Sequence, residues 1–200
     1  MIPTLQTSAP SGGMVLDEDH DKRPEPEKVT KLAGAERLLK TAISLYFEDG
    51  DMLAVHSLAA GAHAVLRTLL VKRGLRGSNI KDSDVIRSEY FEEYIGLMNS
   101  TQNFLKHADR DPDGIHDFYP ESTGFWIFDC VDMYHRLTGR TKYKVFHIFK
   151  IWFLAKHPHY LKEGAYKDQV KALCAKIDLS KHHFSEIIKD PSLFPMNDLI

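Results

Sequence analysis

The sequence predicts an all-α fold, a single up-down helical bundle of about six or seven helices with a disordered N-terminus. Apolar residues recur at spacings of three and four along most of the chain, which is the helical period. Gly, Pro and Asp-Gly signals separate these segments at helix-length intervals. A chain of 200 residues with 43% hydrophobic and 27% charged residues fits one globular domain. We therefore assign residues 1–26 to an N-terminal tail and residues 27–200 to a helical bundle domain.

The N-terminal tail has the composition of an unfolded segment. Ser, Gly and Pro punctuate its start, and the stretch from Asp17 to Lys28 is nearly all charged. Few apolar residues are available there to offset the entropy lost on ordering. We assign no function to this tail.

The first helices follow from their apolar stripes and their end signals. The first is expected at Glu27–Glu48 and the second at Met52–Arg73, with Asp49-Gly50 as the stop between them and Asp51 as an N-cap. A third begins near Asp82 or Ser83, and the polar run 99–102 predicts a break or kink in it. Further helices are expected at Ser122–Thr138, at Lys142–Lys156 after a Thr141 cap, at Lys162–Asp178 and at Lys181–Lys189.

The second helix carries a polar face beside its core stripe. The expected core residues are Leu58, Ala62, Val65 and Leu69, and a second stripe contains His56, His63 and Arg67. Small residues occupy much of the remaining helix surface, which indicates a central, largely buried helix. The polar side chains of the second stripe then need hydrogen-bond partners. They are either hydrogen-bonded core residues or ligand-binding groups. His56 and His63 lie about 10 Å apart along the axis and cannot readily share one metal ion.

The segment from Asn103 to Asp113 is the densest cluster of chemically capable side chains. If it is helical, Asn103 and His107 share one face, and Lys106 and Arg110 form another i,i+4 pair. His107 is the side chain here that can change protonation near neutral pH. The alternative is that a helix C-terminus attracts basic side chains and that Asp and Pro make the exit turn.

Two metal motifs are incomplete in this sequence. Asp109, Asp111 and Asp113 match the first half of a calcium-binding EF-hand loop, but the position of its bidentate acid holds Pro120. Asp132 and His135 form one carboxylate-x-x-His unit, and a di-metal bundle needs a second copy. We therefore predict no metal site and no cofactor.

The Lys-His-Ala-Asp run that begins at Lys106 resembles a segment of a group of bacterial all-helical proteins. Over residues 28–155 the helical pattern is similar to the HEPN group of nucleotide-binding and RNA-cleaving domains. The resemblance implies a catalytic His107. Active members carry an Arg four to six residues before that His, and these positions are Ser100, Thr101 and Gln102 here.

Charge and hydropathy limit the partners. The net charge of −2 gives no global field that favours nucleic acid, so any contact with RNA needs a local patch. No apolar run has the length of a membrane span and no signal peptide precedes the core. Cys130 and Cys174 lie far apart, so we expect buried free thiols in a reducing cytoplasm, with a disulfide between them as the alternative.

Three functions remain open from the sequence. The first is a binding module with a polar pocket for a phosphate-bearing ligand such as a nucleotide or RNA. Its expected pocket residues are His56, His63, Arg67, Asn103, Lys106, His107 and Arg110. The second is a HEPN-like ribonuclease that uses His107 as acid or base. The third is a structural homodimer whose aromatic helices pack between subunits. The pocket depends on the polar face of the second helix meeting the His107 segment.

Overall fold

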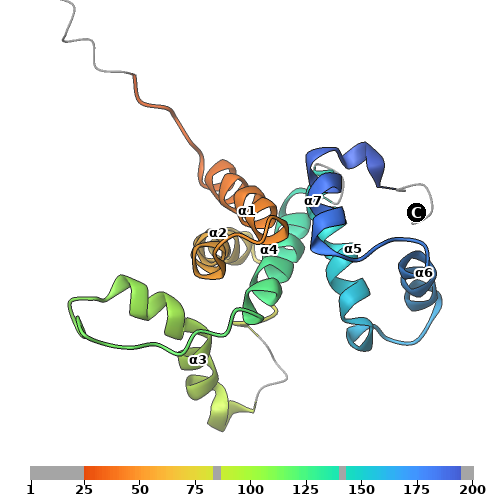
Figure 1. Ribbon diagram of the computed structural model, residues 1–200. Coiled ribbons are helices and arrows are strands. Elements are labelled where there is room, and N and C mark those ends of the chain that lie inside the picture. The colour runs from red at the N-terminus through yellow and green to blue at the C-terminus, as the bar shows by residue number, and fades with distance from the viewer. Residues whose placement is uncertain (1–24, 83–86, 140–142, 195–200) are drawn as a thin grey trace, which may run out of the picture.

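The computed structural model describes residues 25–82, 87–139 and 143–194, and these ranges contain helices and no strand (Figure 1). The all-α prediction is confirmed. The described helices are α1 (Lys31–Phe47), α2 (Met52–Lys72), α3 (Ser88–Lys106), α4 (Ser122–Thr138), α5 (Lys144–Lys156), α6 (Ala165–Cys174) and α7 (Lys181–Lys189), with short 3₁₀ turns at Pro158–Tyr160 and Pro191–Leu193.

Side-chain caps explain where several helices begin. Thr30 caps α1 by accepting a hydrogen bond from the backbone N of Ala33 at 3.2 Å, so this helix starts four residues later than predicted. Asp51 caps α2 as expected, accepting from the backbone N of Ala54 at 2.9 Å. The fourth and seventh predicted helices have the predicted bounds, and α6 is shorter at both ends.

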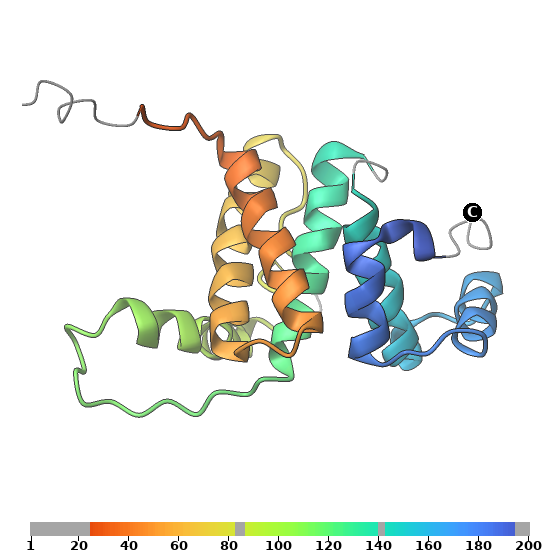
Figure 2. The same ribbon diagram turned by 45° about the horizontal axis from the view of Figure 1, so that its top comes forward.

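The core of the bundle lies between α1, α2 and α4, with α5 and α7 packed on its other side (Figure 2). An aromatic cluster joins α1, α5 and α7. Phe47 stacks on Phe184 with ring centroids 5.6 Å apart, and it meets Trp152 edge to face at 5.0 Å. The run Ile151–Ala155 is buried throughout, as expected for a central helix.

Because α2 packs on both α1 and α4, its buried arc is wide. The predicted stripe of Leu58, Ala62, Val65 and Leu69 is buried only at Ala62, and the other three are half-buried. The buried face instead consists of Val55, His56, Ala59, Ala60, Ala62, His63, Leu66 and Leu70. By length and composition, α2 is also the one described helix that could cross a membrane, a test that buried core helices pass as well.

The α3 helix projects from the bundle and packs only sparsely on the other helices (Figures 1 and 2). Thr101 is its one buried residue. It continues without a break through the polar run 99–102, where the sequence predicted a break or kink, and it ends at Lys106. A return loop of residues 107–121 then brings the chain back to α4. The α3 helix and this return loop together are called the arm below.

Some predictions lie outside the described residues. These are the unfolded state of residues 1–24 and the N-caps at Ser83 and Thr141. Glu25 and Pro26, the described end of the predicted tail, are exposed and not helical.

Candidate functional site

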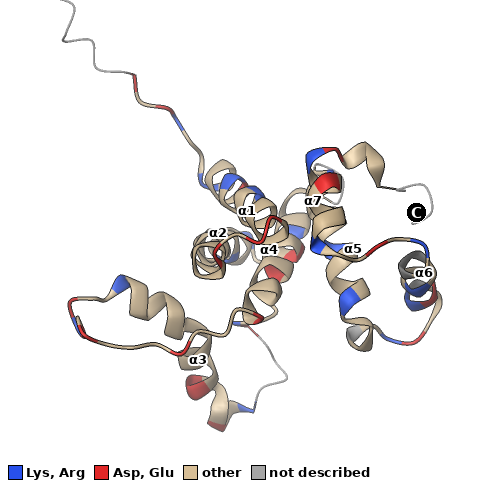
Figure 3. Cartoon of the chain, in the orientation of Figure 1, with Lys and Arg blue, Asp and Glu red and all other residues tan. Residues whose placement is uncertain are grey.

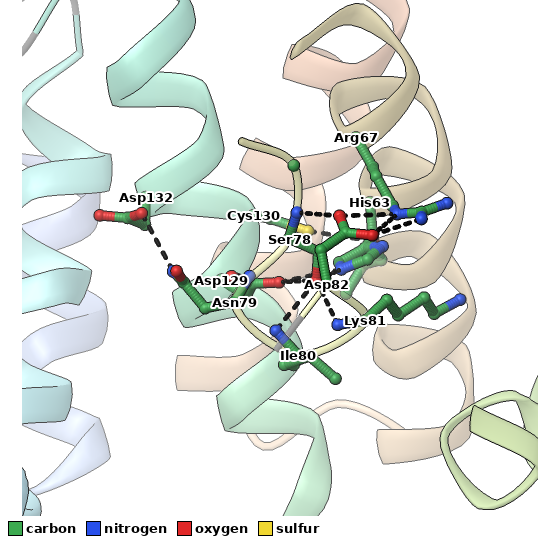
Figure 4. A network of polar contacts seen from close by, with 12 residues as sticks. His63, Arg67, Ser78, Asn79, Ile80, Lys81, Asp82, Asp129, Cys130 and Asp132 are labelled. Atoms are coloured by element: carbon green, nitrogen blue, oxygen red, sulfur yellow. Dashed lines mark hydrogen bonds and ion pairs between the residues drawn. The ribbon is translucent and has the colours of Figure 1, made fainter. Parts of the chain in front are cut away.

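A buried polar network joins α2, α4 and the loop 75–82 (Figure 4). The hydroxyl of Ser78 donates to Oδ2 of Asp129 at 2.6 Å. Nε2 of His63 lies 3.0 Å from the same carboxylate oxygen and 2.9 Å from Oγ of Ser78. The second carboxylate oxygen of Asp129 accepts from the backbone N of Asn79 at 2.9 Å. The side chains of His63, Ser78 and Asp129 are each no more than 2% exposed.

The charges in this network follow from burial and hydrogen bonding. Burial works to raise the pKa of Asp129, but the hydrogen bonds from His63, Ser78 and the backbone of Asn79 outweigh it and lower that pKa. Burial lowers the pKa of His63 despite the attraction of Asp129. The network therefore holds a carboxylate and a neutral imidazole at neutral pH.

The Ser, His and Asp of this network do not form a catalytic triad. In a triad the imidazole bridges its partners through two different nitrogens, taking a proton from the Ser at one and donating to the Asp at the other. Here a single nitrogen of His63 faces both partners, and Ser78 already donates its proton to Asp129. Because Ser78 is also fully buried, this geometry holds the loop in place and does not activate a nucleophile.

Arg67 and Asp82 hold the same loop from outside. Nε of Arg67 donates to both carboxylate oxygens of Asp82 at 3.0 and 2.9 Å, and Nη2 of Arg67 also contacts this carboxylate. Asp82 accepts in addition from the backbone N of Ser78 at 2.7 Å. A Cβ at Gly77 would come within 2.1 Å of Oδ2 of Asp82, so any side chain there would displace this carboxylate.

A row of side chains on α4 completes the attachment of the loop. Arg136 donates to the carbonyl oxygens of Arg76 and Gly77, both at 2.6 Å, and Asp132 accepts from Asn79 at 3.1 Å. The loop is thus fastened to two helices at several points. His63, through Nε2, and Arg67, both predicted from the sequence as ligand-binding, help to hold this loop, while Nδ1 of His63 has no hydrogen-bond partner among the described residues.

An open cavity of about 680 Å³ lies where the arm meets α2 and α4. Its walls are largely apolar, with hydroxyl and imidazole groups among them. The lining residues are His56, Leu97, Met98, Ser100, Thr101, Ile115, His116, Asp117, Tyr119, Ser122 and Trp126.

His56 is a buried polar group in the wall of this cavity. Its ring meets Phe118 and Trp126 edge to face, at centroid distances of 5.6 and 5.3 Å. Nδ1 lies 3.5 Å from Oγ1 of Thr123, and Nε2 has no hydrogen-bond partner among the described residues. Burial, with the nearby charges of His116 and Lys81, lowers the pKa of His56 to about 4. The side chain is therefore a neutral imidazole with one unused polar atom.

His116 is an imidazole in the cavity wall that was not among the predicted site residues, although Arg110 and His116 fit the Arg-to-His spacing of the HEPN group. Its Nε2 lies 2.8 Å from Oγ1 of Thr101, and its ring stacks on Phe104 at 5.3 Å. Both contacts join the return loop to α3. Sequence spacing did not reveal them, because His116 lies in a segment without helical period.

The sequence-predicted site is only partly assembled. His56 lines the cavity, whereas His107, half-buried at the C-cap of α3, does not. The predicted site residues near His107 are also exposed and lie outside the cavity; these are Asn103, Lys106 and Arg110. This cavity therefore does not join the polar face of α2 to the His107 segment, and a pocket that holds both stays a prediction.

The return loop carries an acidic surface (Figure 3). It contains Asp109, Asp111, Asp113, Asp117 and Glu121 against one Arg, Arg110. The three carboxylates of the partial calcium motif are exposed here. In the described part of the chain, no three His, Cys, Asp or Glu side chains gather as a group that could hold a metal ion.

Comparison with protein-family models, with curated proteins and with solved structures finds no match to this chain. The similarity to the HEPN group therefore remains an expectation from the sequence.

Proposed function

We propose that this chain is a binding protein for a small nucleotide-class ligand, a planar heteroaromatic ring that bears phosphate. The observation that carries the proposal is the open cavity between the arm and the bundle, which combines aromatic walls with an unused buried imidazole nitrogen. Its volume of about 680 Å³ falls in the range of small-molecule sites.

The walls of the cavity suit a flat ring with polar edges. Tyr119 is exposed and offers a face on which a base can stack, and the buried Trp126 adds apolar wall. An unsatisfied buried polar atom costs about 1–3 kcal/mol, so a ligand that displaces the neighbouring wall and hydrogen-bonds Nε2 of His56 would recover free energy that the empty protein lacks. The hydroxyls of Ser100, Thr101 and Ser122 give further hydrogen-bonding positions.

Lys81 supports the assignment of a phosphate. Its Nζ lies 4.9 Å from the ring centroid of Trp126 and donates to Oδ1 of Asn99 on α3 at 2.6 Å. Burial, together with the charges of Arg67 and Lys106, lowers the pKa of Lys81. A partly desolvated ammonium beside the cavity wall gains from an anionic partner.

The acidic return loop favours a small ligand over RNA. An RNA strand needs several phosphate contacts along a basic surface. The loop beside this cavity instead presents five carboxylates. A mononucleotide needs only one phosphate contact, and we assign that contact to Lys81.

The test is calorimetric titration of the protein with a nucleoside monophosphate, the matching nucleoside and inorganic phosphate. We expect the monophosphate to bind most tightly. Lys81→Met should weaken binding of the monophosphate and leave the affinity for the nucleoside unchanged. Tyr119→Ala, at a side chain that is 67% exposed, should weaken both by about tenfold through lost stacking.

His107→Ala is the matched control, because His107 lies outside the cavity. It should bind the monophosphate like the parent protein. Absence of heat and of thermal stabilisation with all three compounds would contradict the proposal. RNA cleavage by the parent protein that is lost in His107→Ala would instead favour the ribonuclease function.

A further inference from the structure

His56 lies at the junction between the bundle and the arm. It belongs to α2, and Trp126 and Thr123 of α4 lie against its ring. The return loop adds Phe118, whose ring meets the imidazole edge to face with centroids 5.6 Å apart. The imidazole is only 2% exposed. Part of its burial therefore comes from the arm, which lies outside the bundle core.

Few contacts of the described residues attach the arm to the bundle. Met98 packs against the hydrophobic core, and Oδ1 of Asn99 accepts a hydrogen bond from Nζ of Lys81 at 2.6 Å. Thr101 is the one buried residue of α3, but its hydroxyl lies 2.8 Å from Nε2 of His116, within the arm itself. A segment with so little buried surface opens at a lower cost in free energy than the core helices.

The closed arm makes protonation of His56 unfavourable. Burial, the charge of His116 and the charge of Lys81, in this order, lower the pKa of His56 to about 4. Nε2 has no hydrogen-bond partner among the described residues, so the Nε2–H of an imidazolium would lack an acceptor. Phe118 supplies part of the burial and His116 supplies a charge, and both belong to the return loop.

The other titratable groups around His56 do not offset this effect. The return loop adds Tyr119 and Asp117 to the cavity wall, and Asp117 is exposed, so water screens its attraction. The carboxylate of Asp129 on α4 is already bonded to His63 and Ser78. The cavity residues of α3 and α4 carry no charge; these are Leu97, Met98, Ser100, Thr101, Ser122 and Trp126.

We propose that the junction of arm and bundle is an acid-sensitive switch, in which protonation of His56 opens the arm while the bundle stays folded. Opening removes Phe118 and His116 from the imidazole and lets water bond its N–H groups. The coupling is reciprocal, because a closed arm that disfavours the proton is itself disfavoured by the proton to the same degree. The switch needs no ligand in the cavity.

The direction of the switch follows from the pKa of His56 in the two forms. With the arm closed this pKa is about 4, and solvation in the open form returns it towards the ordinary 6.5. The closed form therefore keeps its full advantage above about pH 6.5 and loses it as the pH falls to about 4. The ratio of open to closed molecules should rise over this range by up to about 300-fold.

Acrylamide quenching of tryptophan fluorescence, measured from about pH 7 to 4, tests the switch. The chain has two tryptophans. Trp126 lies against His56 at the junction, and Trp152 lies in the aromatic cluster of the core. We expect acid to expose Trp126 to the quencher while Trp152 stays protected and the helical circular dichroism is retained. The same measurement on Trp152→Phe assigns the signal to Trp126.

Three variants identify the group that responds. His56→Gln has no titrating group and should keep Trp126 protected throughout the range. Phe118→Ala uncovers the imidazole and should move the opening to higher pH. His107→Ala is the matched control, because His107 lies at the C-cap of α3 and outside the cavity, and it should open like the parent protein.

Three results would overturn the switch. The first is a Trp126 that stays protected in the parent protein at the acid end of the range. The second is acid exposure of Trp126 that His56→Gln leaves unchanged. The third is loss of helicity in step with that exposure, because arm and bundle would then unfold together. An unchanged pH of opening in Phe118→Ala would overturn the role of the return loop as the cover of His56.

Discussion

Burial holds His56 neutral, and this gives stability a defined pH dependence. The pKa of His56 is about 4 in the folded chain against an ordinary 6.5, so the unfolded chain takes up the proton first as the pH falls. We expect the free energy of unfolding to fall between about pH 6.5 and 4, by about 3 kcal/mol in total from this residue. Above that window His56 contributes no pH dependence.

The measurement is urea unfolding across this pH window, compared with His56→Gln, which has no titrating group. The variant should show a shallower loss of stability on acidification. It keeps part of the slope, since burial lowers the pKa of His63 in the same direction. Equal slopes in the two proteins would show that His56 is not held neutral.

The Ser78 hydroxyl should be worth far more than an ordinary hydroxyl. It donates to Asp129 and accepts from the backbone N of Ile80 and of Lys81, at 3.0 and 2.8 Å. Ser78→Ala leaves a buried carboxylate and two backbone donors short of partners, so we expect a loss of about 2–4 kcal/mol by urea unfolding. Thr68→Ala, at an exposed hydroxyl on α2, should change stability by less than about 0.5 kcal/mol. Equal costs would mean that the network adds no stability.

At the scale of elements, the loop 75–82 depends on a glycine. A Cβ at Gly77 would lie 2.1 Å from Oδ2 of Asp82, so Gly77→Ala must displace the carboxylate that Arg67 holds. We expect a loss of about 2 kcal/mol. The control is Gly34→Ala on α1, where a Cβ makes only ordinary contact with Val29 and should be neutral or stabilising. Thermal unfolding compares the two, and a neutral Gly77→Ala would show that the loop adapts.

Local signals predict helices with caps and apolar stripes well, and they do so here for α2, α4 and α7. The start of α3 is different. Asp82, an adequate N-cap by residue type, is instead bonded to Arg67, fifteen residues earlier, and α3 begins at Ser88. The polar run 99–102 did not end α3, because a helix on a projecting arm can expose polar residues at no cost.

The candidate site could be predicted only as far as residue type and helical face allow. The sequence placed His56 and His63 on a face that needs partners, and both are buried. It could not identify Asp129, which lies 66 residues from His63 and meets it through the packing of α2 on α4. The direction of α3, which separates His107 from α2, also depends on tertiary packing.

At the scale of the whole molecule, the fold has a stable bundle and a less buried arm. Since Thr101 is the one buried residue of α3, we expect its backbone amides to exchange with deuterium at least about a hundredfold faster than those of α2 and α4 in dilute protein. Hydrogen-exchange mass spectrometry measures this directly. Equal protection of α3 and α2 in dilute monomer would show that the arm is as stable as the bundle.

Leu97 and Ser100 border both the cavity and a groove of about 480 Å³ along the first half of α3. A ligand in the cavity therefore contacts the same two side chains as a ligand in the groove. Binding of a small molecule in the cavity should therefore change the affinity of the groove for a second molecule.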